Sequence, residues 1–148
     1  MTSMKADFYS QKKLAQCFIT KWSSQISIPP RIFNELKNKS KNIVAVIPGG
    51  SKKFTFFYTD ASQILSVKLI LDNASLNEKF FTSLRQTLKE LKISNLFSTG
   101  ICFKDDVCVW EGVFEFDNDE NFEEIRKKLS SVTHVNKSKF NKIVVDDQ

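Results

Sequence analysis

The sequence predicts an α+β protein in which an N-terminal helix and β-hairpin module precedes an antiparallel sheet built in the order β-α-β-β-α-β. Two stretches in the second half repeat apolar residues at helical spacing, and each stands between strand-like runs. A hairpin of β-branched and aromatic residues separates those two stretches. The chain has 148 residues, of which 41% are hydrophobic, so it can bury a real core.

The N-terminal segment, residues 1–24, is predicted to be mainly helical. From Asp7 to about Trp22, apolar Leu14, Phe18 and Trp22 recur every fourth residue and so share one face of a helix. The Ser23-Ser24 pair then ends the helix.

The next segment, residues 25–62, is predicted to contain a strand, a short helix and a hairpin. Gln25 to Ile28 alternates polar and apolar residues, and Pro29-Pro30 stops that strand and starts a helix that reaches about Leu36. The runs Ile43–Ile47 and Phe54–Tyr58 flank the turn sequence Pro48-Gly49-Gly50-Ser51, which predicts a hairpin.

The residues from Gln25 to Ile32, followed by Leu36 and the run Ile43–Ile47, resemble the AbrB/SpoVT swapped-hairpin domain. That resemblance implies an intertwined dimer that docks on double-stranded DNA. The sequence departs from the family pattern at Lys41-Asn42, where Gly-Asp is usual, and at Ser24, where glycine is usual. A strand and a proline-initiated helix in this order are also common without any DNA contact.

The charge distribution places the expected polyanion contact in the N-terminal half. Residues 1–66 contain ten Lys/Arg and three Asp/Glu, whereas the remainder contains twelve and fourteen, within a total of +5. Lysine neutralises phosphate without reading base edges bidentately, so the expected binding is sensitive to salt. A generally lysine-rich surface explains the same excess without a partner. The candidate nucleic-acid-binding residues are Lys12, Lys13, Lys21, Arg31, Lys37, Lys39, Lys41, Lys52 and Lys53.

The second half begins with a predicted strand, Ser66–Leu71, and a helix. Ser75 and Glu78 have the spacing of a capping box, in which each side chain bonds a backbone N–H of the other, so the helix is expected to begin there. Its inward stripe is Leu76, Phe80, Leu84, Leu88 and Leu91.

The predicted hairpin of this half consists of Leu96–Phe103, a turn at residues 104–106 and Val107–Phe116. Cys108, Trp110, Phe114 and Phe116 share the face expected to meet the core. Val107, Val109 and Val113 alternate with Glu111 and Glu115 on the other face, which is too apolar for water. We therefore expect these three valines to meet another sheet, from either the N-terminal half or a second subunit.

Asp117, Asn118 and Asp119 predict the start of a second helix, with Glu120, Glu123 and Glu124 near its positive end. Phe122, Ile125 and Leu129 form its inward stripe, and Val132–Val145 is a final extended segment. In element order and length, residues 66–145 resemble the ACT domains, which have the ferredoxin-like fold. This resemblance implies a regulatory module that pairs through sheet edges or faces and senses a small-molecule effector.

Two places are candidates for contact with such an effector. The first is the loop containing Asp72 and Asn73, where ACT domains often carry a glycine that this chain lacks. The second is Ser98-Thr99-Gly100, because a mid-strand glycine permits close approach to the backbone; a β-bulge is the favoured explanation of that glycine.

The sequence gives little support for catalysis or for a cofactor. His134 is the only histidine and is expected on a strand, and the carboxylates near Glu120 are explained by the helix N-terminus. Cys17, Cys102 and Cys108 are odd in number and lack a C-x-x-C motif, which favours reduced thiols and a cytoplasmic location. A three-residue turn would pair Cys102 directly with Cys108, whereas a two- or four-residue turn would set Cys102 opposite Val109. No metal site and no membrane span are expected.

We therefore expect a non-enzymatic, dimeric DNA-binding protein of the transcription-regulator type, with an ACT-like module for dimerisation or sensing. The alternative is a protein-interaction or regulatory module that binds no nucleic acid. Under that alternative, both halves form one domain and the basic surface meets an acidic protein.

Overall fold

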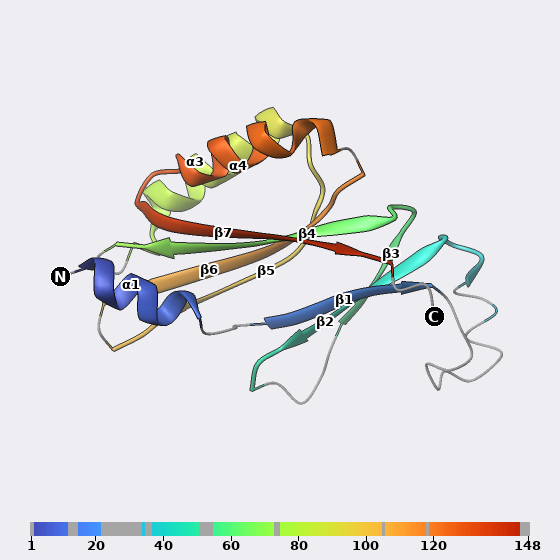
Figure 1. Cartoon of the computed structure of the whole chain (residues 1–148), viewed down its shortest axis with the longest axis horizontal. Helices are drawn as coiled ribbons and strands as arrows, with labels where there is room; N and C mark the ends of the chain where they lie inside the picture. The colour runs from blue at the N-terminus through green and yellow to red at the C-terminus, as the bar shows by residue number, and fades with distance from the viewer. Residues whose placement is uncertain are drawn as a thin grey trace.

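The computed structural model describes residues 2–11, 15–21, 34, 37–50, 55–72, 75–104, 106–117 and 119–145. The ordered elements are α1 (Thr2–Ser10), β1 (Ala15–Lys21), β2 (Asn42–Pro48), β3 (Thr55–Thr59), β4 (Gln63–Leu71), α3 (Glu78–Leu91), β5 (Asn95–Cys102), β6 (Cys108–Glu115), a short 3-10 helix η2 (Asp119–Asn121), α4 (Phe122–Ser130) and β7 (Val135–Val144). The strands form two antiparallel sheets (Figure 1).

The four-stranded sheet has the strand order β5-β6-β4-β7, with every neighbouring pair antiparallel. Helices α3 and α4 lie together on one face of this sheet (Figure 1). This is the ferredoxin-like βαββαβ arrangement. The predicted fold class and the strands and helices predicted for this half are therefore confirmed, with β4 beginning three residues earlier than expected.

The start of α3 differs from the capping box expected at Ser75. The N-cap is Asn77, whose side-chain Oδ1 accepts a hydrogen bond of 3.1 Å from the backbone N–H of Phe80. Ser75 lies two residues before this N-cap, and its hydroxyl donates to the carbonyl of Asp72. Asparagine is as effective an N-cap as serine, so the helix can begin at Glu78. At the other end, Lys92 closes the helix in the left-handed conformation at φ 54°.

The core between this sheet and its helices contains the side chains predicted for it. Phe80 and Leu84 from α3, and Ile125 and Leu129 from α4, pack against residues of β4 and β6 that include Trp110 and Phe114. Gly112 is required here, because a Cβ at that position would lie 2.2 Å from the Trp110 ring and 3.0 Å from that of Phe114. The indole of Trp110 therefore occupies the space that any side chain at Gly112 would need.

The helix predicted from Asp7 to Trp22 is wrong over most of its length. The helix is α1, which ends at Ser10, and β1 follows as a strand antiparallel to β2, with Ala15 opposite Pro48 and Lys21 opposite Asn42. The sequence Phe18-Ile19-Thr20 has a high strand propensity, and its partner strand is the β-branched run of β2. Pairing between distant strands thus outweighs the four-residue apolar spacing.

The predicted hairpin in residues 43–58 is confirmed as β2 and β3, which pair from Asn42 opposite Thr59 to Val46 opposite Thr55. Together with β1 they form a three-stranded sheet of order β1-β2-β3. The strand expected at residues 25–28 and most of the following helix lie outside the described residues. The part of the chain on which the AbrB resemblance mainly rests is therefore not described.

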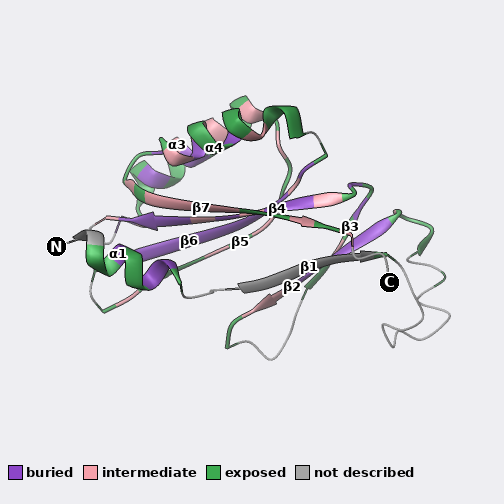
Figure 2. Ribbon diagram, viewed as in Figure 1, coloured by how far each residue is buried: buried purple, intermediate pink, exposed green. Residues whose placement is uncertain are grey.

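The second face of the four-stranded sheet is covered by two different elements (Figures 1 and 2). At one end, Ala6 and Tyr9 of α1 bury Ile70, Val107 and Val109. At the other end, Val44 and Val46 of the three-stranded sheet pack against Ile64 and Val113, with Phe57, Leu96, Phe97, Ile143 and Val145 around them. The molecule therefore has three layers: the helices α3 and α4, the four-stranded sheet, and a layer shared by α1 and the second sheet.

Candidate functional site

The two outer strands of the four-stranded sheet differ in charge. Strand β7 carries Lys137, Lys139 and Lys142, whereas the sequence of β5, Asn-Leu-Phe-Ser-Thr-Gly-Ile-Cys, has no charged side chain. Lys137 pairs with Asp7 of α1, and Lys142 pairs with Asp119 at 3.1 Å. Lysines on an outer strand oppose pairing with another strand, so β7 is protected and β5 is not.

The outer side of β5 presents main-chain groups. The N–H of Phe103 donates to the carbonyl of Val107 at 2.9 Å, so these two residues are a hydrogen-bonded pair of the hairpin. Because such pairs alternate along antiparallel strands, the N–H and C=O of Ser98, Gly100 and Cys102 point away from β6. Within the described parts of the chain, no strand pairs with this side of β5. Ile101 is 44% exposed on the same strand.

Gly100 does not form the β-bulge that the sequence favoured. It pairs regularly with Trp110, and the irregularity in β5 lies between Asn95 and Phe97. Gly100 instead makes room for Leu76, whose nearest methyl lies 3.0 Å from the Cβ position at this residue. Its small size therefore serves the packing of the segment that leads into α3.

The candidate ligand residues are separated by the fold. Asp72, at the end of β4, is held toward β7: its N–H donates to the carbonyl of His134 at 3.1 Å, and its carboxylate accepts a hydrogen bond from the amide of Asn136. Ser98, Thr99 and Gly100 lie on β5, the outer strand that β6 separates from β4. Asn73 lies outside the described residues. Asp72, which follows β4, and the candidate residues of β5 therefore lie on strands that are not neighbours in the sheet.

Val107, Val109 and Val113 are all buried by other parts of the same chain, with at most 4% exposure. Between Val109 and Val113, the cross-strand partners Lys68 and Glu111 form an ion pair of 3.2 Å, with side chains 11% and 10% exposed. The Lys68 ammonium also donates to the carbonyl of Ser10 at 3.1 Å, where α1 ends. The sequence marked Glu111 only as a polar residue on an apolar face; the matching signal was Lys68 in the middle of β4.

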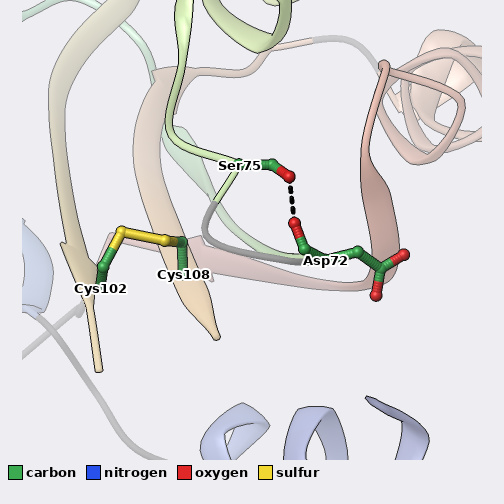
Figure 3. The surroundings of a disulfide bond; sticks show 4 residues. All are labelled: Asp72, Ser75, Cys102 and Cys108. Carbon is green, nitrogen blue, oxygen red and sulfur yellow. Dashed lines mark hydrogen bonds between the residues drawn. A yellow bond between two sulfur atoms is a disulfide. The ribbon is translucent and has the colours of Figure 1, made fainter. Parts of the chain in front are cut away.

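Cys102 and Cys108 form a disulfide, which corrects the expectation of reduced thiols (Figure 3). The two residues are directly opposite each other across the hairpin, as expected for a three-residue turn at residues 104–106. They are a non-hydrogen-bonded pair, in which opposite side chains approach most closely. Cys108 is fully buried in the helix-side core, while Cys102 ends the outer strand and is exposed. An odd cysteine count therefore did not exclude a local pair.

The candidate nucleic-acid residues are only partly described. Lys21, Lys37, Lys39 and Lys41 are exposed, and the Lys39 ammonium lies 5.4 Å from the centroid of the Tyr58 ring. The backbone N–H of Lys41 donates to Asp60 at 3.0 Å. Lys12, Lys13, Arg31, Lys52 and Lys53 lie outside the described residues.

His134 lies in the turn before β7, with φ 73°, and not on a strand as expected. A groove of about 430 Å³ lies between α3 and α4. Across it, Lys128 of α4 pairs with Glu90 of α3 at 3.8 Å, and it also pairs with Glu124, one turn earlier on its own helix, at 3.4 Å. Across the described ranges, there is no group of three His, Cys, Asp or Glu side chains that could hold a metal ion. Nor does any described helix have the length and apolar character needed to cross a membrane.

No family model matches the chain, and no curated protein matches it in sequence. Among solved structures, it is similar to a putative glycine cleavage system transcriptional repressor, at 10% identity and TM-score 0.47, over 82% of this chain and 66% of that one. The C-terminal domain of the MgtC protein from Mycobacterium tuberculosis is similar at 13% identity and TM-score 0.47, over 58% and 93%. Prephenate dehydratase from Streptococcus mutans is similar at 11% identity and TM-score 0.42, over 97% and 82%. Identities this low transfer neither an activity nor a ligand to this chain.

Proposed function

We propose that the chain is a non-enzymatic regulatory module of the ACT type that forms a homodimer by pairing strand β5 with β5 of a second copy. The observation that carries this proposal is the contrast between the two sheet edges: three lysines on β7 and no charge on β5. An uncharged outer strand with outward main-chain groups is a template for another strand. Antiparallel pairing of two such strands about a twofold axis makes one eight-stranded sheet.

The geometry of β5 suits this pairing at its centre. Ser98 and Gly100 contribute outward N–H and C=O groups and have small side chains, so a second backbone can approach closely. Ile101, exposed by 44%, supplies apolar area that a partner strand would cover. The pairing leaves α3, α4 and the second sheet in place.

Replacing Ser98 with proline tests the dimer directly. Proline removes the outward N–H of residue 98 and leaves the β5–β6 hydrogen bonds, which involve its neighbours. In analytical ultracentrifugation, we expect the wild type and Ser98→Ala to have twice the mass of one chain. Ser98→Pro should have the mass of a single chain. A monomeric wild type, or a dimeric and folded Ser98→Pro, overturns the proposal.

A charged residue on the same strand provides the second arm of this test. Ile101→Lys places an ammonium on β5, as β7 already has, and keeps the backbone intact. We expect it to be monomeric with an unchanged far-ultraviolet circular dichroism spectrum. If Ser98→Pro fails to fold, a dimeric Ile101→Lys is sufficient to reject β5 pairing.

The effector of such a module is proposed to contact Ser98, Thr99 and Gly100, because these residues sit where two copies of β5 would meet. Asp72 is a weaker candidate, since its N–H and carboxylate already have partners in His134 and Asn136. Screening the twenty amino acids by thermal shift tests the class of effector that ACT-type modules would take. A stabilising amino acid whose effect persists in Ser98→Pro would place its site away from the β5 edge.

Binding of polyanions is a second candidate function, and the exposed lysines favour it. Lys37, Lys39 and Lys41 lie within five residues, and the described residues from 37 to 59 include no carboxylate. We expect the protein to bind duplex DNA at about 50 mM salt and to release it as the salt concentration rises towards about 200 mM. Substituting the three lysines together with glutamine should abolish the shift in a gel titration, whereas wild-type protein that ignores DNA at low salt excludes this function.

A further inference from the structure

The hairpin tip that carries the disulfide is also the surface on which α1 rests. Phe103 and Val107 adjoin the two cysteines in sequence and face the opposite side of the sheet. The Tyr9 ring stacks on the Phe103 ring, with centroids 4.2 Å apart and planes at 16°. Val107 is buried in the same cluster as Ala6 and Tyr9. The disulfide therefore links the two strand ends that carry Phe103 and Val107, the residues that contact α1.

Two polar contacts add to the attachment of α1 at Tyr9. Its sequence, Thr-Ser-Met-Lys-Ala-Asp-Phe-Tyr-Ser, has no apolar stripe, and Met4 and Phe8 are more than 60% exposed. Besides the cluster at Tyr9, α1 is held by the pair of Asp7 with Lys137 and by the bond from Lys68 to the carbonyl of Ser10. A nine-residue helix is not stable alone in water, so α1 depends on this docking.

We propose that Cys102–Cys108 is a redox-exchange site and that its reduction by a dithiol releases α1 from the sheet. The two bridged residues differ in exposure to solvent, and this difference decides which sulfur an exchanging thiolate attacks. Cys102 is exposed at the end of the outer strand, and Cys108 is fully buried. The sulfur of the exposed residue, Cys102, is therefore the one that we expect an incoming thiolate to attack.

The exchange proceeds in two balanced steps. A thiolate of the dithiol attacks Sγ of Cys102, the Cys102–Cys108 bond breaks, and Cys108 leaves as a thiolate that takes up a proton. The second thiol of the reductant then attacks its own sulfur in the mixed disulfide and releases Cys102. The protein gains two electrons and two protons, and the dithiol becomes a disulfide.

Reduction removes the covalent link across the hairpin, so that this end depends on its hydrogen bonds, among them the bond from the Phe103 N–H to the carbonyl of Val107. The turn at residues 104–106 includes Asp106 in the left-handed conformation at φ 59°, which favours glycine, so the chain holds a strained turn residue next to the link. Without the link, this end of the hairpin opens more readily, and Phe103 and Val107 lose their fixed position beneath Tyr9. Release of α1 uncovers Ile70, Val107 and Val109, the residues that Ala6 and Tyr9 bury when α1 is docked.

Hydrogen exchange measured by mass spectrometry tests this inference in full-length Cys17→Ser protein, whose only cysteines are the bridged pair. Treatment with dithiothreitol should add two hydrogen atoms to the intact mass and expose two thiols to iodoacetamide. We expect amides of α1 to exchange about tenfold faster after reduction, with amides of α3 unchanged. The Cys102→Ala/Cys108→Ala variant should behave like reduced protein with or without dithiothreitol.

Each other result counts against the inference. Two thiols that are alkylated before reduction mean that the bridge does not form. Unchanged exchange in α1 means that the bridge forms but does not control docking. Faster exchange in α3 as well means that the bridge stabilises the whole fold and does not act as a local switch. The exchange is measured at a protein concentration at which the chain is a monomer. None of these results therefore depends on the proposed β5 dimer.

Discussion

The two faces of the four-stranded sheet are both buried, yet they are built differently. The helix face is one continuous core in which Phe80, Trp110 and Phe114 pack with residues of both helices. The opposite face is divided between α1 and the three-stranded sheet, with the Lys68–Glu111 ion pair in the middle. A continuous apolar core stabilises the fold, whereas a divided face can be opened at one end without loss of the other.

The largest expected difference in stability between the two faces comes from truncating two adjacent residues of β6, Phe114 and Val113. Phe114 points into the helix-side core, and Val113 points toward the second sheet. We expect Phe114→Ala to lower the free energy of unfolding by about 4 kcal/mol. Val113→Ala removes two methyl equivalents and should cost about 2 kcal/mol. Urea denaturation measures both, and equal losses would contradict the view that the helix face dominates stability.

The ion pair of the divided face is expected to give the next largest effect. Glu111→Ala leaves the ammonium of Lys68 nearly buried without its carboxylate and should cost about 3 kcal/mol. The double variant Lys68→Met/Glu111→Leu removes both charges, so it should cost less than Glu111→Ala alone. Denaturation of all three proteins provides the test, and a double variant that is less stable than Glu111→Ala would contradict this account.

Glycine at position 112 tests how tightly the helix face is packed. In Gly112→Ala the new methyl would lie 2.2 Å from the buried Trp110 ring, so the ring must move. We expect the free energy of unfolding to fall by about 2 kcal/mol. Gly100→Ala is the matched control, because the methyl 3.0 Å away belongs to the partly exposed, flexible Leu76. Thermal unfolding should show a clear loss for residue 112 and a small one for residue 100. The reverse order would show that the space over Gly112 is not filled by the indole.

The smallest expected effect concerns the start of α3. Asn77→Ala removes the side-chain bond to the N–H of Phe80 and should cost about 1 kcal/mol. Ser75→Ala removes a hydroxyl that bonds Asp72 outside the helix. If Ser75→Ala costs more than Asn77→Ala in urea denaturation, the helix begins at the capping box that the sequence indicated.

The helix face was readable in the sequence because its signals are local. The stripes of α3 and α4 recur at helical spacing, and Trp110 and Phe114 alternate along β6, so each element indicated its own buried side. The divided face depends on contacts between distant segments. Nothing in residues 15–21 indicates that they pair with β2, and their apolar spacing suggested a helix.

The candidate site shows the same limit. The valines of β6 were recognised as a face in need of cover, but the cover itself, α1 and the second sheet, became visible only in three dimensions. Asp72 and Gly100 were predicted as two separate candidates, and the strand order places β4 and β5 on either side of β6. The disulfide required the turn length, which set Cys102 opposite Cys108.

The lysines of β7 also limit how far copies of this chain can assemble. If both outer strands accepted a neighbour, β5 of one copy could add to β7 of the next, and a repeated head-to-tail contact grows into a fibre. Within the four-stranded sheet, the lysines Lys137, Lys139 and Lys142 on β7 leave β5 with β5 as the pairing that the proposal uses. In the proposed dimer, growth through this sheet would stop at two copies, and we expect polymerisation through its edges to require the loss of those positive charges.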